Sequence, residues 1–138
     1  MSRRGYFNPA RLPDWSDMFS QIVTVERAGL RFIHLSGQVG VDRDKKIAGA
    51  GNLESQTRQA FKNIKIALSE AGAKMEDVVK MTIYVVKYKY PDAGILKTVI
   101  QENFPAGKLP ALSLIDVAAL AMEEFLIEID TFAVADLE

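Results

Sequence analysis

Two pairs of side chains have types and spacings that could do chemistry. His34 and Ser36 alternate along one predicted strand, with Gln38 on the same face, and Glu128 and Asp130 alternate along another. Residues two apart in a strand face the same way, with Cα atoms roughly 7 Å apart. This separation is loose for a histidine that must activate a serine through a hydrogen bond of about 3 Å. We therefore interpret His34 as a half-buried strand residue rather than a catalytic base.

The acidic pair has two interpretations. In an apolar cleft, Glu128 and Asp130 could act as acid and base if the environment separates their pKa values. Solvated strand positions produce the same alternation of carboxylates. The residues alone leave both interpretations open.

The composition argues against metal and cofactor sites. The chain has no cysteine and one histidine, whereas a zinc site needs three or four protein ligands. Residues 49–52 (Gly-Ala-Gly-Asn) precede a predicted helix, but they lack the third glycine and the strand–helix–strand context of a dinucleotide-binding motif. We expect a flexible loop there, and neither a metal nor an organic cofactor.

The charge balance argues against nucleic acid and membranes as partners. The 138 residues include 17 basic and 18 acidic side chains, a net charge of −1, so no strong field attracts polyanions. Lysine and tyrosine interleave between Lys80 and Tyr90, as in single-strand binders, but no matching basic surface accompanies them. No apolar run reaches membrane-spanning length. We expect a cytoplasmic protein that binds a small molecule.

The elements that would position these residues form an α+β pattern. β-Rich segments predict strands at residues 21–26, 31–39, 78–86, 110–117 and 126–134. Asn52 is a good N-cap for a helix that Gly72 ends, and Pro91 begins a second helix that ends at residue 104. Residues 1–18 carry two prolines and no clear period, so we expect an extended arm. The predicted order is β-β-α-β-α-β-β, in a single domain spanning residues 1–138.

Two helices are too few to sandwich this sheet, so we expect both on one face of a mixed sheet. The other face, rich in valine, isoleucine and leucine, then needs a cover. Identical subunits are the simplest source of one. The sequence therefore predicts an oligomer.

Four segments together resemble one known family. They are residues 34–42 (HLSGQVGVD), residues 56–64 (QTRQAFKNI), Ala71-Gly72-Ala73 with Asp77-Val78-Val79-Lys80, and Pro110-Ala111 through Ile127-Glu128-Ile129. On these motifs, the chain is identified as a member of the reactive-intermediate deaminase (RidA-like) family, also labelled endoribonuclease L-PSP or translation inhibitor. The resemblance covers nearly everything after about Met18.

The resemblance implies a fold, an assembly and a reaction. It implies a chorismate-mutase-like fold, a homotrimer, and three sites in the clefts between subunits. The implied reaction is hydrolysis of 2-imino or 2-enamino acids to 2-oxo acids and ammonia, without metal or organic cofactor. In such enzymes a glutamate on the last strand positions the attacking water. Glu128 and Ser36 match the family and are the predicted catalytic residues, and Gly37 is a predicted substrate-binding residue.

Three substrate-binding positions depart from the family pattern. Leu112 stands where an arginine two residues after a proline would clamp the substrate carboxylate with two charge-assisted hydrogen bonds. Leu114 replaces a common cysteine, and Phe19 replaces the usual tyrosine. Hydrogen bonds to charged groups contribute about 1.5–3 kcal/mol each. We therefore expect poor turnover of 2-imino acids and a more apolar cleft.

Three functions follow from the resemblance and its departures. The first is an imine or enamine hydrolase for a less polar substrate, with Glu128 handling water. The second is a trimer that binds a small metabolite without turnover. The third, RNA binding or cleavage, is least favoured because a net charge of −1 and one histidine offer little for phosphodiester chemistry. The retained Ser36 and Glu128 favour the enzyme.

Overall fold

A computed structural model describes residues 1–137 of the chain. The elements are β1 (Arg3–Phe7), β2 (Ile22–Arg27), β3 (Leu30–Val39), α1 (Leu53–Glu70), the short 3-10 helix η1 (Met75–Asp77), β4 (Val78–Val86), α2 (Asp92–Asn103), β5 (Ala111–Val117) and β6 (Ile127–Asp136). The strands form one sheet in the order β1-β2-β3-β6-β4-β5. Only β4 and β5 pair in parallel, so the sheet is mixed.

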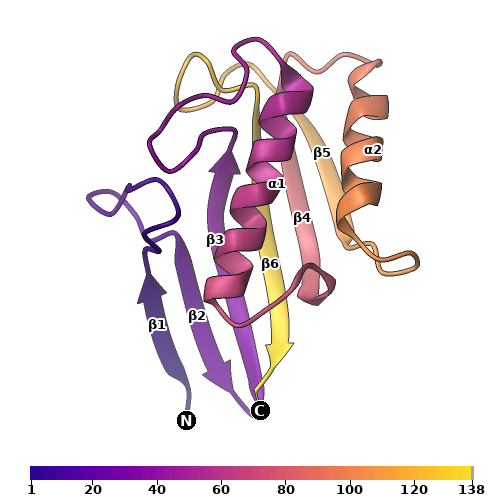
Figure 1. Ribbon diagram of the computed structural model, residues 1–138. Helices are drawn as coiled ribbons and strands as arrows, with labels where there is room; N and C mark the ends of the chain where they lie inside the picture. Colours follow the sequence, from indigo (N-terminus) through magenta and orange to yellow (C-terminus); the bar gives the residue numbers. More distant parts are fainter. Residues whose placement is uncertain (138) are drawn as a thin grey trace.

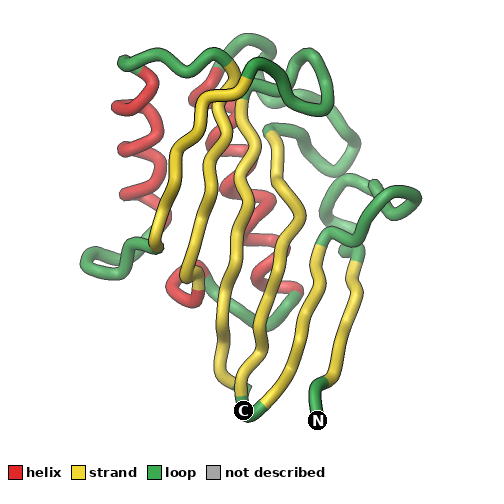
Figure 2. Tube along the Cα trace, turned by 180° about the vertical axis from the view of Figure 1, so that it is seen from behind, coloured by secondary structure: helices red, strands yellow, loops and turns green. Residues whose placement is uncertain are grey.

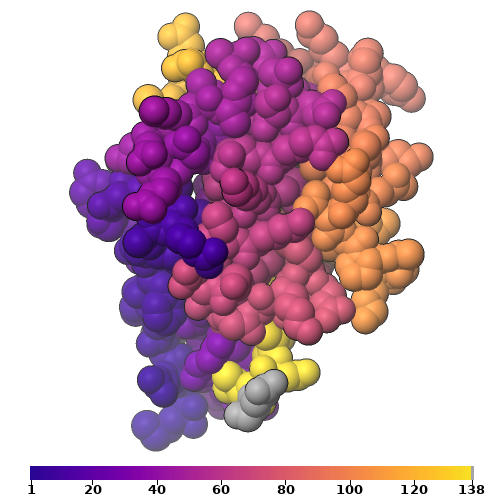
Figure 3. All heavy atoms as spheres, viewed as in Figure 1, coloured from indigo at the N-terminus to yellow at the C-terminus, as the bar shows by residue number. Residues whose placement is uncertain are grey.

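Both α-helices lie on the same face of the sheet, as predicted (Figure 1). In the space-filling view, the side chains of α1 and α2 cover that face (Figure 3). Seen from behind, the sheet carries no helix (Figure 2); we call this the open face. The core lies between helices and sheet and includes the fully buried Ile33, Phe61, Ile64, Ile83 and Ile129.

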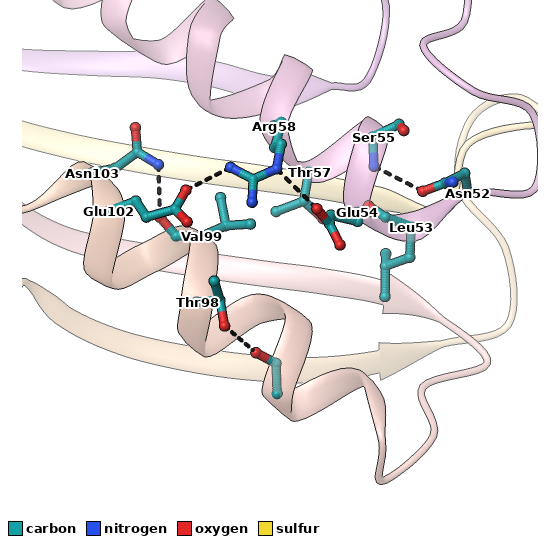
Figure 4. Close-up of polar contacts among 11 residues, drawn as sticks. Asn52, Leu53, Glu54, Ser55, Thr57, Arg58, Thr98, Val99, Glu102 and Asn103 are labelled. Carbon is teal, nitrogen blue, oxygen red and sulfur yellow. Dashed lines mark hydrogen bonds and ion pairs between the residues drawn. The ribbon is translucent and has the colours of Figure 1, made fainter.

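Helix α1 forms where the sequence places a cap and an apolar stripe. The Asn52 side chain accepts a hydrogen bond from the Ser55 backbone N–H at 2.9 Å, which satisfies a free donor of the first turn. Arg58 then donates to Glu54 on its own helix and to Glu102 on α2 (Figure 4). These exposed ion pairs stabilise weakly, but they connect the two helices across their outer surface.

The first residues form a strand that the sequence did not predict. β1 pairs antiparallel with β2, from Arg3 opposite Glu26 to Phe7 opposite Ile22. The arm expected for residues 1–18 thus begins with an edge strand that pairs with β2. Its sequence, RRGYF, shows no alternation of apolar and polar residues, because an edge strand exposed on both faces has no core to match.

Strand β3 contains a bulge that changes which way Gln38 faces. Leu35 pairs with Thr131 of β6, but the next regular pair is Gln38 with Ile129. This irregularity places Gln38 on the buried side, where it is 2% exposed and its amide donates to Gln21 Oε1 at 2.7 Å. The expectation that Gln38 shares a face with His34 is wrong, because a bulge inserts a residue into the alternation.

The open face is apolar and aromatic toward one end of the sheet. Phe132 of β6 stacks with Phe32, with ring centroids 6.4 Å apart, and its ring is tilted by 32° against that of His34, with centroids 4.6 Å apart. His34 is exposed and packs against an aromatic ring. The expectation of a half-buried histidine is wrong, because the His34 side chain is exposed. The expected aliphatic residues are present beside the rings: Val23 pairs with His34, and Val25 and Val134 pair with Phe32.

Candidate active site

The other part of the open face is acidic. On β6, Ile127 and Ile129 point into the core, so Glu128 and Asp130 point to the open face, where both are half-buried. On the neighbouring strand β4, Tyr84 pairs directly with Glu128. We call Tyr84, Glu128 and Asp130 the acid cluster.

Burial and neighbouring charges shift the pKa values of the three groups in the acid cluster. Burial raises the pKa of Glu128, and the nearby charge of Asp130 raises it further. Burial also raises the pKa of Asp130, but the Tyr84 hydroxyl, beside its carboxylate, acts in the opposite direction. The negative charge of Asp130 in turn raises the pKa of Tyr84. Such a cluster can hold a proton on a carboxyl group closer to neutral pH than an isolated carboxyl group can.

Gly37 lies against Glu128 at the bulge of β3. A Cβ atom added to Gly37 would lie 2.5 Å from Glu128 Oε2 and 2.6 Å from its Cδ, closer than real Cβ contacts allow. Only glycine leaves room for the Glu128 carboxylate in this position. The sequence analysis assigned the two residues separately, Gly37 to substrate binding and Glu128 to catalysis, and the structure places them side by side.

Ser36 uses its hydroxyl to hold the backbone. Its Oγ donates to the Ser20 carbonyl at 2.6 Å, and the Ser36 backbone N–H donates to Gln21 at 2.9 Å. These bonds fix the start of β2 and so the position of Phe19, which is 37% exposed. Because the Ser36 hydroxyl donates its hydrogen bond to a backbone carbonyl, Ser36 is suited to holding the segment before β2 in place.

Leu112 and Leu114 lie on the opposite face of the sheet from Glu128. In the β4–β5 register, Leu112 pairs with Met81 and Leu114 with Ile83, and both partners point into the core. The two leucines line a cavity of about 300 Å³ between β5 and α2; we call it the leucine cavity. A single chain therefore does not bring the two leucines together with Ser36, Gly37 and Glu128.

Sequence reasoning missed two neighbours of the acidic strand. Tyr84 and Lys80 were assigned to a lysine–tyrosine run, although their alternation along β4 places both on the open face. Lys80 Nζ donates to Ser113 Oγ at 2.8 Å, which connects β4 to β5 on that face. The register of β4 against β6 would have revealed these contacts, but a single sequence does not give the register.

The described part of the chain offers no metal centre: within residues 1–137, no three or more His, Cys, Asp or Glu side chains cluster suitably. Within the same residues, no helix is long and apolar enough to cross a membrane.

Comparison with known proteins places this geometry in a family. The family model described as Endoribonuclease L-PSP matches residues 12–135. The chain belongs to the endoribonuclease L-PSP family. A rat protein of this kind, named 2-iminobutanoate/2-iminopropanoate deaminase, is 31% identical over 87% of this chain and 90% of its own length. A RutC family protein from Pyrococcus abyssi is 34% identical over 74% of this chain and 77% of its own length.

Solved structures agree with this family membership. The crystal structure of RidA from the Antarctic bacterium Psychrobacter sp. superposes with a TM-score of 0.80 at 25% identity, covering 95% of this chain and 99% of that one. The RidA-like family prediction is confirmed, as is the α+β fold with a mixed sheet and two helices on one face.

Proposed function

We propose that this protein hydrolyses an imine or enamine, and that Glu128 holds the attacking water. The observation that supports this most is the Glu128 carboxyl, half-buried against Gly37 with a raised pKa. Proteins that share 30–34% identity with the chain are named 2-iminobutanoate/2-iminopropanoate deaminases. No cofactor is required for such a hydrolysis.

The reaction needs one group that both takes and gives a proton. Water adds to the carbon of the protonated C=N group while the Glu128 carboxylate accepts a proton from it, which gives a neutral carbinolamine. The protonated Glu128 then gives this proton to the nitrogen. As the C–N bond breaks, the Glu128 carboxylate takes the hydroxyl proton, the carbonyl forms, and ammonia leaves and carries that proton away as ammonium. A carboxyl group with a raised pKa serves both steps better than an ordinary one near neutral pH.

The cleft for this reaction requires more than one copy of the chain. Glu128 and Gly37 lie on the open face, whereas Leu112 and Leu114 line the leucine cavity on the other face. The cavity lies beside β5, which ends the sheet order, so a neighbouring copy could place its acid cluster there. We propose a homotrimer with such inter-subunit clefts, in keeping with the family resemblance.

The substrate differs from a small 2-imino acid. The arginine that would clamp a carboxylate is replaced by Leu112, which cannot donate a hydrogen bond. A carboxylate bound beside it would lose two charge-assisted bonds. We propose that this protein acts inefficiently on 2-iminopropanoate and prefers a less polar substrate.

The test is hydrolysis of 2-iminopropanoate generated in situ by an amino-acid oxidase. Semicarbazide traps the remaining imine, so an active enzyme lowers the rate of semicarbazone formation. We expect a small effect with 2-iminopropanoate and a larger one with imines that carry longer aliphatic side chains. Buffer-level rates with every imine would contradict the proposed function and leave binding without turnover, the second candidate, which the apolar lining of the leucine cavity favours.

Light scattering tests the assembly separately. We expect three times the chain mass of 15.3 kDa, and a monomer at micromolar concentration would contradict the inter-subunit cleft. RNA binding stays the least favoured function because the net charge is −1 and a binding protein of this kind would lose affinity steeply with salt.

A further inference from the structure

Two buried glutamine side chains lie at the bulge of β3, and the proposed reaction does not use them. Gln21, just before β2, and Gln38, at the end of the bulge, are each 2% exposed; we call them the glutamine pair. Gln38 Nε2 donates to Gln21 Oε1 at 2.7 Å. Burying amide groups costs free energy unless their polar atoms are paired, so the other partners of the glutamine pair show what it holds.

The Gln38 side chain fixes the backbone on both sides of Gly37. Its Nε2 also donates to the Ser36 carbonyl at 3.0 Å, so a side-chain hydrogen bond joins the two neighbours of Gly37. The register between β3 and β6 shifts over this segment, and a bulge disrupts the regular ladder of backbone hydrogen bonds. The Gln38 amide therefore holds backbone that the ladder holds less well.

Gln21 attaches the bulge to the segment before β2. Its Nε2 donates to the Pro13 carbonyl at 3.1 Å, and its backbone N–H donates to Asn8 Oδ1 at 3.1 Å. Its backbone carbonyl accepts a hydrogen bond from the Ser36 N–H at 2.9 Å. Both polar atoms of the Gln21 side chain thus have partners, and the bulge is anchored to residues outside β3.

We propose that the glutamine pair positions Glu128 by holding Gly37 against its carboxylate. The space at Gly37 is too small for a Cβ atom, so a displacement of the bulge changes the contact with Glu128 directly. Removing one amide leaves the other buried with an unpaired polar atom, which favours a relaxed bulge. The inference rests on the proposed function for its effect on catalysis, but the environment of the Glu128 carboxylate can be measured without any reaction.

The test is the titration of the Glu128 side-chain carboxyl carbon by ¹³C NMR, in the full-length protein and in Gln38→Met. Methionine keeps the length of the side chain but donates no hydrogen bond. Burial and the charge of Asp130 raise the pKa of Glu128, and Tyr84 is the other titratable group that interacts with it. The variant keeps both neighbours, so a relaxed bulge that exposes Glu128 should lower its midpoint toward 4.5. A midpoint equal to that of the wild type would overturn the proposal.

Thr57→Val is the matched control for the loss of a buried hydrogen bond. Thr57 is fully buried on α1, and its Oγ1 donates to the Leu53 carbonyl at 2.7 Å. The variant should lower the free energy of unfolding and leave the Glu128 midpoint unchanged. An equal fall of the midpoint in Thr57→Val would show that the midpoint follows stability alone, and the proposal would fail.

The double variant Gln21→Met/Gln38→Met separates positioning from folding. Replacing both members of a buried pair by apolar groups avoids an unpaired amide between them, so part of the lost free energy of unfolding should return. The Ser36 carbonyl still lacks its side-chain donor, so the Glu128 midpoint should stay low. A midpoint that returns to the wild-type value together with stability would overturn the proposal. If Gln38→Met alone does not fold, the midpoint of the double variant is the test.

Kinetics distinguish this inference from the proposed function. With the best imine substrate, Gln38→Met should lower kcat roughly tenfold and change KM less, as for a displaced catalytic group. If the wild type hydrolyses no imine but the midpoint falls in Gln38→Met, the proposed function fails and the positioning of Glu128 stands. If the wild type is active and the variant keeps both its kcat and its midpoint, the inference fails and the proposed function stands.

Discussion

The acid cluster and the leucine cavity lie on opposite faces of one sheet and differ in how they are held. The acid cluster belongs to β4 and β6, inner strands with neighbours on both sides, and Glu128 is confined by contact with Gly37. The leucine cavity lies beside the edge strand β5, where Leu112 and Leu114 are 39% and 38% exposed. The proposed function therefore assigns the chemistry to inner strands of the sheet, and specificity to an edge strand that substitutions can change with less effect on stability.

Loss of the Glu128 carboxyl is the strongest test of this division. Glu128→Gln removes the proton acceptor but keeps the shape, so the rate of imine hydrolysis should fall about 10²- to 10⁴-fold. The loss is measured on the best imine substrate. Glu123→Gln, in the exposed loop before β6, should leave the rate unchanged. A rate within twofold of wild type would remove the acid cluster from the mechanism.

Leu112→Arg tests the specificity side of the comparison. The new guanidinium can make two charge-assisted hydrogen bonds to a carboxylate, so kcat/KM for 2-iminopropanoate should rise at least about tenfold. Leu109→Arg, at the more exposed leucine of the same cavity, is the control and should have a smaller effect. An unchanged rate would mean that the cleft binds the carboxylate in another way.

Gly37→Ala tests whether close packing confines Glu128. The new methyl group would overlap the Glu128 carboxylate, so that side chain must rotate away and kcat should fall roughly tenfold, as for a displaced general base. Gly94→Ala, on α2 with open space around it, should keep full activity and gain helix stability. Wild-type kcat in Gly37→Ala would show that Glu128 acts from more than one position.

Local features of the site could be predicted from the sequence, whereas features that depend on the pairing of distant strands could not. Alternation along 126–134 was enough to place Glu128 and Asp130 on one face, and the cap at Asn52 was enough to begin α1, because both are local properties of the chain. The bulge that turns Gln38 inward and the pairing of Tyr84 with Glu128 depend on register between distant strands. The placement of Leu112 and Glu128 on opposite faces of the sheet also depends on the register between strands.

The pH dependence of stability reports on the buried carboxyl groups. Because the folded-state pKa of Glu128 is raised above its ordinary value of 4.5, the folded state holds a proton that the unfolded state releases at lower pH. The free energy of unfolding should therefore fall as pH rises from about 4.5 through the raised pKa, and then level off. Glu128→Gln should flatten this slope in chemical denaturation and leave the contribution of Asp130, whose pKa is also raised by burial. An unchanged slope would mean that the Glu128 carboxyl titrates as it does in solvent.

The smallest expected effect comes from Tyr84, the member of the acid cluster on β4. The Tyr84 hydroxyl lowers the pKa of the neighbouring Asp130 carboxyl. Tyr84→Phe removes this hydroxyl, so the doubly ionised form of the Glu128–Asp130 pair loses stabilisation. The upper apparent pKa of the coupled pair should then rise. Because the proposed hydrolysis requires ionised Glu128, the acid limb of the kcat/KM profile should move to higher pH. The control Tyr6→Phe, on β1, should leave the pH profile unchanged. An unchanged acid limb in Tyr84→Phe would show that the Tyr84 hydroxyl does not influence the pKa values of the two carboxyl groups.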